Sequence, residues 1–305
     1  MAVLELENLV KIYSEKTKAL ANVSFSVEKG EIFGLLGPNG AGKTSLIKIL
    51  IGFSRQTSGD FRIFSEKASW QNRKKIGYLP EKISIHPFLT AVEFLKVSAA
   101  LIGLEKKLIK QRIPVVLERV KLSHTGSKKI GAFSKGMMQR LGLAAAIIGE
   151  PEILLLDEPG SGLDPIGTVE LREIILEEKK RGAAILVNSH RLSEIEKICD
   201  RVGIINYGKM IASGSLHELQ TGNKRINFTI AEKENAVIEK VKNSISGFAK
   251  SVTNNENQFT LVYDDESGMK TIPGKIVEAG AELLKYEKLG ESLEDIFMRV
   301  MKSNE

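Results

Sequence analysis

The chain has 305 residues, 42% of them hydrophobic and 27% charged, a balance typical of globular domains that excludes disordered and fibrous classes. No apolar run approaches the roughly 20 residues that span a bilayer, so no transmembrane helix is expected. The N-terminal segment lacks the pattern of a signal peptide, so none is expected. The single cysteine, Cys199, excludes an intramolecular disulfide and fits a reducing cytosol. The net charge of +6 permits contact with nucleic acid or an anionic membrane face, but scattered lysines favour an ordinary solvated surface.

Strand and helix patterns alternate through the first two thirds of the chain. Residues 32–36, 153–156 and 183–187 are short apolar runs without alternation, which is typical of strands buried on both faces of a parallel sheet. An amphipathic helix is predicted from Lys43 onward, and another ends at Gly182. This order predicts an α/β domain.

The segment GPNGAGKT, Gly37 to Thr44, matches the phosphate-loop pattern G-x-x-x-x-G-K-[ST] between a predicted strand and a predicted helix. Its glycines let the backbone turn its amides inward, Lys43 can place a charge on the β and γ phosphates, and the Thr44 hydroxyl can bind magnesium. The candidate nucleotide-binding residues here are Gly37, Pro38, Asn39, Gly40, Ala41, Gly42, Lys43, Thr44 and Ser45.

Two carboxylates follow the apolar run of ILLLDEP. The strand delivers Asp157 to its carboxyl end, the edge where open sheets bind their ligands, and Asp157 is positioned to hold Mg²⁺. Glu158 is then available to polarise an attacking water. An acidic pair that only ends a strand is the alternative interpretation, since such pairs are common on α/β surfaces.

The segment AFSKGMMQRL, residues 132–141, predicts a helix that begins after Ser134, a good N-cap residue. The backbone amides of a helix N-terminus bind anions. Nothing adjacent in the sequence supplies the anion, so the rest of this site is expected elsewhere.

The motifs GPNGAGKT, FSKGMMQR, ILLLDEP, SGLD and NSH, in that order, resemble the nucleotide-binding subunit of ATP-binding cassette transporters. The match covers roughly the first 220 residues. The resemblance implies a P-loop NTPase cassette over residues 1–221, with a mixed sheet core, an antiparallel β subdomain and a helical subdomain at about 82–150.

The resemblance also assigns roles to aromatic and histidine side chains. Tyr13 matches the aromatic that stacks on adenine, although a simple strand tyrosine is the alternative. His190, at the end of ILVNSH, matches the switch histidine that reaches the γ-phosphate. The remaining histidines, His86, His124 and His217, match nothing and are expected to be surface or packing residues.

FSKGMMQR resembles the signature motif, usually LSGGQ, which completes the site of a second subunit. Ser134 and Gly136 keep the hydroxyl and the side-chain-free approach, whereas Lys135 replaces a glycine and Met137 replaces the glutamine. Asp164 in SGLD matches a loop that touches the partner subunit. It can equally be the N-cap of the next helix, since proline follows it, and the two interpretations are compatible.

The segment IGYLPEKISIHPFLTAVEFL falls where the family has its magnesium-sensing and permease-coupling loop. The family usually has glutamine there, and this chain has Glu81. A glutamate can still bind Mg²⁺ through an oxygen, but it adds negative charge beside phosphates.

The C-terminal third has the pattern strand, helix, strand, strand, helix, strand, followed by a helix at SLEDIFMRVM. The expected strands are residues 225–230, 248–252, 258–264 and 283–289, and the expected helices before SLEDIFMRVM are residues 235–244 and 274–284. This βαββαβ order predicts a small α+β ferredoxin-like domain over residues 222–305, after the linker QTGNKR. It resembles the appendage of transporter ATPases of the drug, lantibiotic and polysaccharide export type.

The implied function is ATP hydrolysis that powers transport, with ATP and Mg²⁺ as cofactors. The catalytic candidates are Glu158, His190 and Lys43, and the metal candidates are Thr44, Asp157 and Glu81. The expected partners are a second copy in a head-to-tail dimer and a separate membrane permease on the inner face of the cell membrane, with no nucleic acid. The alternative is a soluble ATPase of the same family that acts on nucleic acid or the ribosome.

Overall fold

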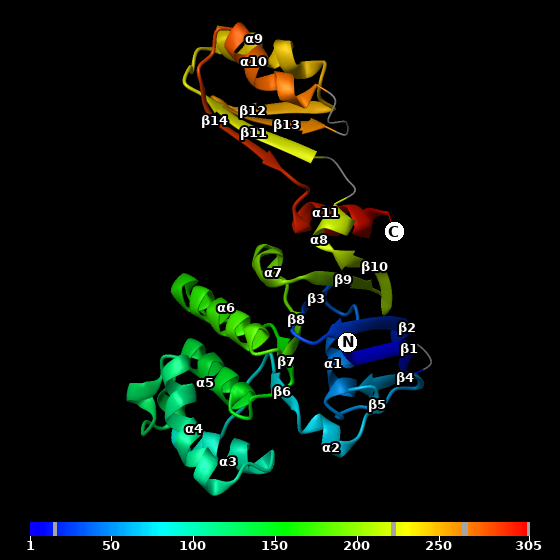
Figure 1. Cartoon of the computed structure of the whole chain (residues 1–305), viewed down its shortest axis with the longest axis vertical. Coiled ribbons are helices and arrows are strands. Elements are labelled where there is room, and N and C mark those ends of the chain that lie inside the picture. The colour runs from blue at the N-terminus through cyan, green and yellow to red at the C-terminus, as the bar shows by residue number, and fades with distance from the viewer. Residues whose placement is uncertain (15–16, 221–223, 264–267, 304–305) are drawn as a thin grey trace. The chain divides into compact units, whose positions relative to one another are not determined.

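The computed structural model describes residues 1–14, 17–220, 224–263 and 268–303. The chain divides into two compact units, Met1–Ser215 and Leu216–Glu305, each with its own hydrophobic core (Figure 1). The domain boundary predicted between residues 221 and 222, and part of the predicted linker, lie outside the described residues.

Unit 1 contains ten strands and seven α-helices among the described residues. The strands are β1 (Ala2–Ser14), β2 (Thr17–Glu28), β3 (Ile32–Leu36), β4 (Ser58–Ile63), β5 (Glu66–Lys67), β6 (Ile76–Leu79), β7 (Ile153–Asp157), β8 (Ala184–Asn188), β9 (Arg201–Asn206) and β10 (Lys209–Ser215). The helices are α1 (Lys43–Leu50), α2 (Trp70–Arg73), α3 (Ala91–Leu101), α4 (Lys106–Arg119), α5 (Lys135–Ile147), α6 (Pro165–Lys180) and α7 (Leu192–Ile198).

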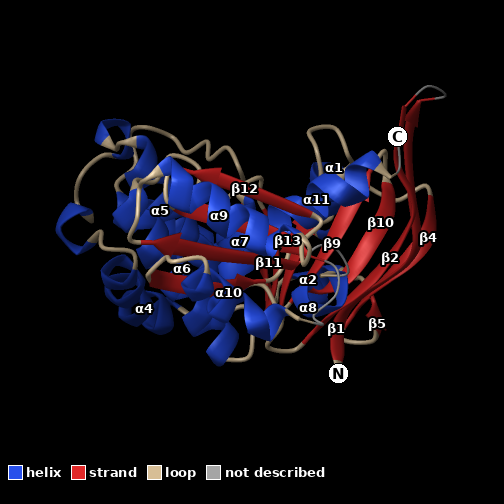
Figure 2. Ribbon diagram, turned by 90° about the horizontal axis from the view of Figure 1, so that it is seen from above, coloured by secondary structure: helices blue, strands red, loops and turns tan. Residues whose placement is uncertain are grey.

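Unit 1 is built on two sheets. One has the order β10-β9-β3-β8-β7-β6, in which all pairs except β10 with β9 are parallel. The other is antiparallel, with the order β2-β1-β4-β5 (Figure 2). Every residue of β3, β7 and β8 is buried, which explains why these strands are continuous apolar runs. Their carboxyl ends define one edge of the sheet, where the phosphate loop and the acidic pair lie.

The helices α3, α4 and α5 gather on the side of unit 1 away from β1, β2 and β4 (Figures 1 and 2). Thr90 and Glu93 form a reciprocal capping box that starts α3, and Ser134 caps α5. This group falls within the segment 82–150 that the sequence predicts as a helical subdomain. Among the described residues, no helix is both long and apolar enough to cross a membrane.

Unit 2 contains a four-stranded antiparallel sheet with the order β12-β13-β11-β14. Its core packs the inner face of the sheet against two helices and includes stacked rings of Phe228 and Phe259, 4.7 Å apart. The elements are α8 (Leu216–Leu219), β11 (Lys224–Ile230), α9 (Asn235–Ser246), β12 (Ser251–Asn255), β13 (Gln258–Tyr263), α10 (Ile272–Glu278), β14 (Leu283–Leu289) and α11 (Leu293–Lys302).

The α/β cassette and the appended βαββαβ order are confirmed. Two boundaries in unit 2 differ from the sequence expectation. The strand expected at 248–252 begins at Ser251, because Phe248 packs against the core and its N–H donates to Ile245 at the end of α9. The helix expected at 274–284 ends at Glu278, because Gly280 takes a left-handed φ of 88°.

Candidate active site

The phosphate loop connects β3 to α1, and two of its glycines are required by close backbone contacts. A Cβ on Gly37 would lie 2.2 Å from the carbonyl oxygen of Ile205, and one on Gly42 would lie 2.3 Å from that of Ala19. Gly42 also has a φ of 109°, which side-chain-bearing residues rarely adopt. The loop therefore keeps its tight path only with glycine at both positions, as the motif predicts.

Lys43 lies at the start of α1 and is buried. Its Nζ donates to the carbonyl oxygens of Gly37, at 2.6 Å, and Pro38, at 2.9 Å. Burial lowers the pKa of Lys43, and the nearby carboxylates of Glu158, Asp157 and Glu81 oppose that shift. The ammonium group is thus held between the loop and a group of acids.

A cleft of about 310 Å³, open to solvent, brings most of the predicted residues together. Its size suits a nucleotide-sized ligand. The lining residues are Tyr13, Thr17, Lys18, Ala19, Asn39, Gly40, Ala41, Gly42, Lys43, Thr44, Ser45, Glu81, Asp157, Glu158 and Asn188. Gly37 and Pro38 are not among these lining residues, but their carbonyl oxygens accept hydrogen bonds from Lys43. We call this region the nucleotide cleft.

Asp157 ends β7 and is almost fully buried beside the cleft. The Nδ2 of Asn188, at the paired end of β8, donates to Asp157 Oδ1 at 2.6 Å. Burial raises the pKa of Asp157; the hydrogen bond from Asn188 and the charge of Lys43 oppose this, whereas Glu81 and Glu158 add to it. Acids gathered in this way favour a bound cation.

Asn188 was missed at the sequence level. It is 2% exposed, and its Oδ1 has no hydrogen-bond partner among the described residues. A buried oxygen of this kind beside Asp157 adds to the oxygen-rich set that Mg²⁺ prefers. The sequence did contain a signal for Asn188, since it is a polar residue at the end of a buried apolar run, in the same position as Asp157 at the end of β7.

Glu158 follows β7 and interacts with the end of the neighbouring strand. Its Oε2 lies 2.7 Å from Nδ1 of His190 and accepts from the Ser189 hydroxyl at 3.4 Å. Its own N–H donates to the carbonyl oxygen of Asn188 at 2.8 Å. Glu158 has a φ of 52°, unusual for a residue with a side chain. The main chain therefore turns sharply to place this carboxylate beside the histidine.

Tyr13 lies near the end of β1 with about half of its surface exposed, at the margin of the cleft. Its hydroxyl donates to Ser45 at 3.4 Å, and Nζ of Lys11 lies 4.6 Å from the ring centroid. The ring belongs to a strand but lies outside the hydrophobic core. Its exposed position is compatible with stacking on a planar ligand.

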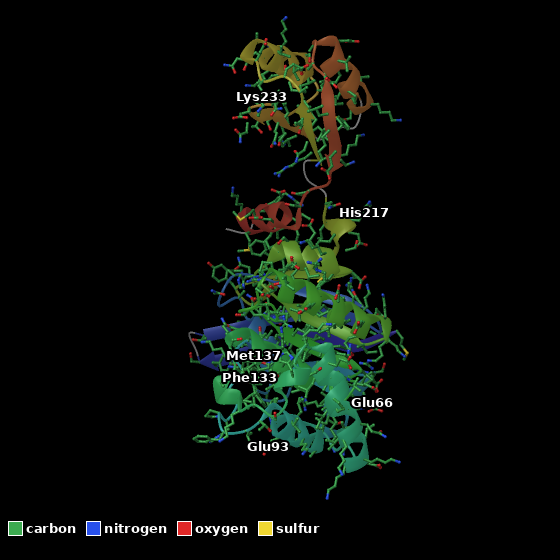
Figure 3. All side chains as sticks on the ribbon, turned by 90° about the vertical axis from the view of Figure 1, so that its left-hand side faces the viewer. Glu66, Glu93, Phe133, Met137, His217 and Lys233 are labelled. Atoms are coloured by element: carbon green, nitrogen blue, oxygen red, sulfur yellow. The ribbon has the colours of Figure 1, made fainter. Side chains whose placement is uncertain are left out.

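The residues of FSKGMMQR lie on a different surface. Ser134 caps α5 by accepting the N–H of Met137 at 3.2 Å, and Phe133 and Met137 lie near each other at this helix start (Figure 3). The lining residues of the hollow here are Lys121, Leu122, His124, Thr125, Ser134, Lys135, Gly136, Met137, Arg140, Gly162, Leu163 and Asp164. We call this the signature surface, and among the described residues it shares none with the nucleotide cleft.

The departure at Lys135 has a structural explanation. A Cβ on Gly162 would come within 2.6 Å of the Lys135 side chain, so the aliphatic stem of Lys135 packs directly over this glycine. The ammonium group is left exposed on the signature surface, where it adds positive charge.

Asp164 is the N-cap of α6, since its Oδ1 accepts the N–H of Gly167 at 2.7 Å, with Pro165 in the first turn. It also lines the signature surface, so the helix-start interpretation and a surface position hold together. Of the unassigned histidines, His86, His124 and His217 are all exposed, and His124 lines the signature surface, which the sequence did not indicate.

Comparisons with known proteins identify the family. A family model described as ABC transporter matches residues 20–161, and one for the C-terminal domain of DrrA1-3-like ATP-binding proteins matches residues 214–301. The chain is 36% identical to the ABC transporter ATP-binding protein YxlF of Bacillus subtilis, over 98% of this chain and 99% of that protein. It is also 36% identical to the bacitracin transport ATP-binding protein BcrA of Bacillus licheniformis, over 98% and 97%.

Solved structures give the same result. The chain is similar to an ATP-binding subunit of an ABC transporter, with 33% identity, a TM-score of 0.67 and coverage of 72% of this chain and 92% of the other. The fold and the matched motifs thus define a P-loop ATPase of the cassette type. The chain belongs to the ATP-binding proteins of ABC transporters, which are ATPases.

Proposed function

We propose that this chain is the ATP-hydrolysing subunit of an exporter and that it acts as a head-to-tail dimer. The observation that carries the proposal is the separation of the nucleotide cleft from the signature surface within unit 1. A complete site forms when the cleft of one copy meets the signature surface of another. Ser134, Gly136 and the exposed charge of Lys135 then face the terminal phosphate, with Met137 beside them and the loop of Asp164 at the interface.

ATP binding is assigned to the phosphate loop, Lys43 and Tyr13. The loop amides and Lys43 hold the phosphates, and the exposed ring of Tyr13 stacks on the base. The residues present fit Mg²⁺, since Thr44, Asp157 and Glu81 line one cleft and the pKa of Asp157 is raised partly by its acidic neighbours. Bound Mg²⁺ supplies charge neutralisation at the phosphates.

Glu158 orients and polarises the attacking water, and His190 holds Glu158 while facing the phosphate. Their 2.7 Å contact supports this division of roles. Lys43, the loop amides and the signature helix of the second copy then surround the terminal phosphate and stabilise the negative charge that develops on it.

Glu81 stands where the family usually has glutamine. It contributes a carboxylate to the cleft, which makes a bound cation more important for offsetting the negative charge. The expected consequence is a stronger dependence of ATP binding on Mg²⁺ than a glutamine would give.

The transported class is proposed from the relatives. Relatives that match over nearly the full length include a protein named for bacitracin transport and one named for linearmycin resistance. A lantibiotic transport protein of Streptococcus pyogenes is 41% identical over 68% of the chain. We assign the chain to export of such antibiotics or peptides, at the inner face of the cell membrane, with a separate permease. Residues 222–305 are proposed as an accessory domain that supports this assembly.

Capture of the tagged full chain from detergent-solubilised membranes tests the class. A polytopic membrane protein that copurifies with wild type, and with the Glu158→Gln variant in MgATP, is the expected result. Copurification of ribosomes or DNA, with no membrane protein, would instead favour an ATPase that acts on nucleic acid or the ribosome.

A further inference from the structure

Gln139 joins the signature helix to the main chain next to Glu158. It lies in the second turn of α5, whose N-terminus carries the signature surface, and only 5% of its surface is exposed. Its Nε2 donates to the carbonyl oxygen of Pro159 at 3.1 Å and to that of Glu158 at 3.4 Å. A side chain of the signature helix thus contacts the main chain at the edge of the nucleotide cleft.

The surroundings of Gln139 make these hydrogen bonds important. It borders a small cavity whose lining includes Pro159, Leu143, Leu163 and Leu171. A buried amide that loses its partners among such side chains is strongly disfavoured, so the two carbonyl groups are held where Nε2 can reach them. The next residue, Arg140, forms an ion pair of 2.7 Å with Glu170 of α6, which also holds α5 against α6.

The main chain that Gln139 contacts has an unusual conformation at Glu158. Glu158 has a φ of 52°, and its N–H is already fixed by the carbonyl oxygen of Asn188. Gln139 restrains the following carbonyl groups, so the residue is held on both sides. The direction of the Glu158 side chain, and its contact with His190, depend on this main-chain conformation.

We propose that Gln139 is a positioning residue for ATP hydrolysis, acting through Glu158. It ties the helix that serves the second copy's nucleotide to the carboxylate that serves the chain's own nucleotide. This inference rests on the proposed function, in which Glu158 orients water. No contact of Gln139 with nucleotide is required, because the effect passes through the Glu158–Pro159 main chain.

The test is a double-mutant cycle on kcat with the full chain. Gln139→Met keeps a similar volume but removes the donor, and we expect a ~10-fold fall in kcat with an unchanged Kd for MgATP. Glu158→Gln lowers kcat much further. If Gln139 acts through Glu158, the double variant has the same residual kcat as Glu158→Gln, whereas independent effects multiply.

A second variant and a control complete the design. Gln139→Glu keeps the side-chain shape but replaces the donor by an acceptor, and the same loss of kcat is expected. Gln111→Met, at an exposed position of α4, should leave kcat unchanged. Wild-type kcat in either Gln139 variant, or a double variant ~10-fold below Glu158→Gln, would overturn the proposal. If Glu158→Gln itself hydrolyses ATP normally, the proposed function fails instead, so the two failures are distinguishable.

Discussion

Oε2 of Glu158 and Nδ1 of His190 lie 2.7 Å apart at the carboxyl edge of the parallel sheet. The carboxylate is 14% exposed and the imidazole 72% exposed, so the pair reaches from the buried strand end to the open surface. In this arrangement the histidine can contact a ligand that enters from solvent while it keeps the carboxylate in place.

Glu158→Gln should lower kcat for ATP hydrolysis by ~10²–10⁴-fold, because the amide cannot act as a base toward water. The Kd for MgATP should change little. Phosphate release and nucleotide titration measure the two quantities. Glu152→Gln, at the exposed far end of the same strand, is the matched control and should hydrolyse ATP as wild type does. Undiminished turnover in Glu158→Gln removes this residue from its role.

Asp157→Asn should stabilise the nucleotide-free protein at neutral pH. The pKa of Asp157 is raised by burial in the folded state, so between the unfolded value of about 3.9 and the folded value the native chain binds more protons than the unfolded chain. Stability from this group is therefore lost as pH rises through that window. Relative to wild type, we expect a higher melting temperature at pH 7.

The same comparison at lower pH provides the control. The advantage of Asp157→Asn should shrink as pH falls toward 3, because below the unfolded value of about 3.9 the wild-type carboxyl is protonated in both states. Asp60→Asn, at an exposed strand position, should show no such trend. A gain that is equal at pH 3 and pH 7 contradicts the electrostatic explanation.

Tyr13→Ala should raise the Kd for ATP by about tenfold, since stacking of a base on an aromatic ring contributes ~1–3 kcal/mol. Tyr13→Phe keeps the ring and loses the contacts of the hydroxyl with Ser45, at 3.4 Å, and with Ser54, so it should bind almost as wild type does. Displacement of a fluorescent ATP analogue measures both. Equal affinity in the Ala variant supports the simple strand tyrosine instead.

Gly136→Asp should abolish most ATP hydrolysis while the monomer still binds ATP. The position has room, since the nearest atom to an added Cβ is the Gly162 carbonyl oxygen at 3.4 Å, so the fold should tolerate it. The new carboxylate places negative charge on the signature surface, where the second copy's phosphate is proposed to lie. Gly136→Ala is the uncharged control and should retain more activity. Weakened ATP binding by the Gly136→Asp monomer argues against a separate signature surface.

The sequence predicts the parts of the site that are contiguous in the chain. The phosphate loop is one uninterrupted segment, and its glycines are required by local backbone geometry, so the motif alone identifies it. Asp157 and Glu158 follow a buried strand whose end is visible as the end of an apolar run. The ferredoxin-like order of unit 2 is predicted for the same reason, because each strand and helix is a contiguous segment with a hydrophobic pattern of its own.

The contacts that sequence reasoning missed are tertiary contacts. Asn188 reaches Asp157 only because β7 and β8 are paired in register. Gln139 reaches Pro159 because α5 packs beside the loop after β7, and Lys135 is tolerated because Gly162 lies beneath its stem. None of these pairs is close in sequence, and a one-residue shift in the pairing of β7 with β8 would separate Asn188 from Asp157.

The composite site is tested most directly by the oligomeric state of Glu158→Gln, measured by light scattering with and without MgATP. Our account predicts a monomer without nucleotide, a dimer with MgATP, and no dimer when Lys43→Ala or Gly136→Asp is added to the same chain. The Lys43→Ala addition removes nucleotide binding, and the Gly136→Asp addition blocks only the signature surface. A Glu158→Gln chain that binds MgATP and remains monomeric at saturation would contradict the account.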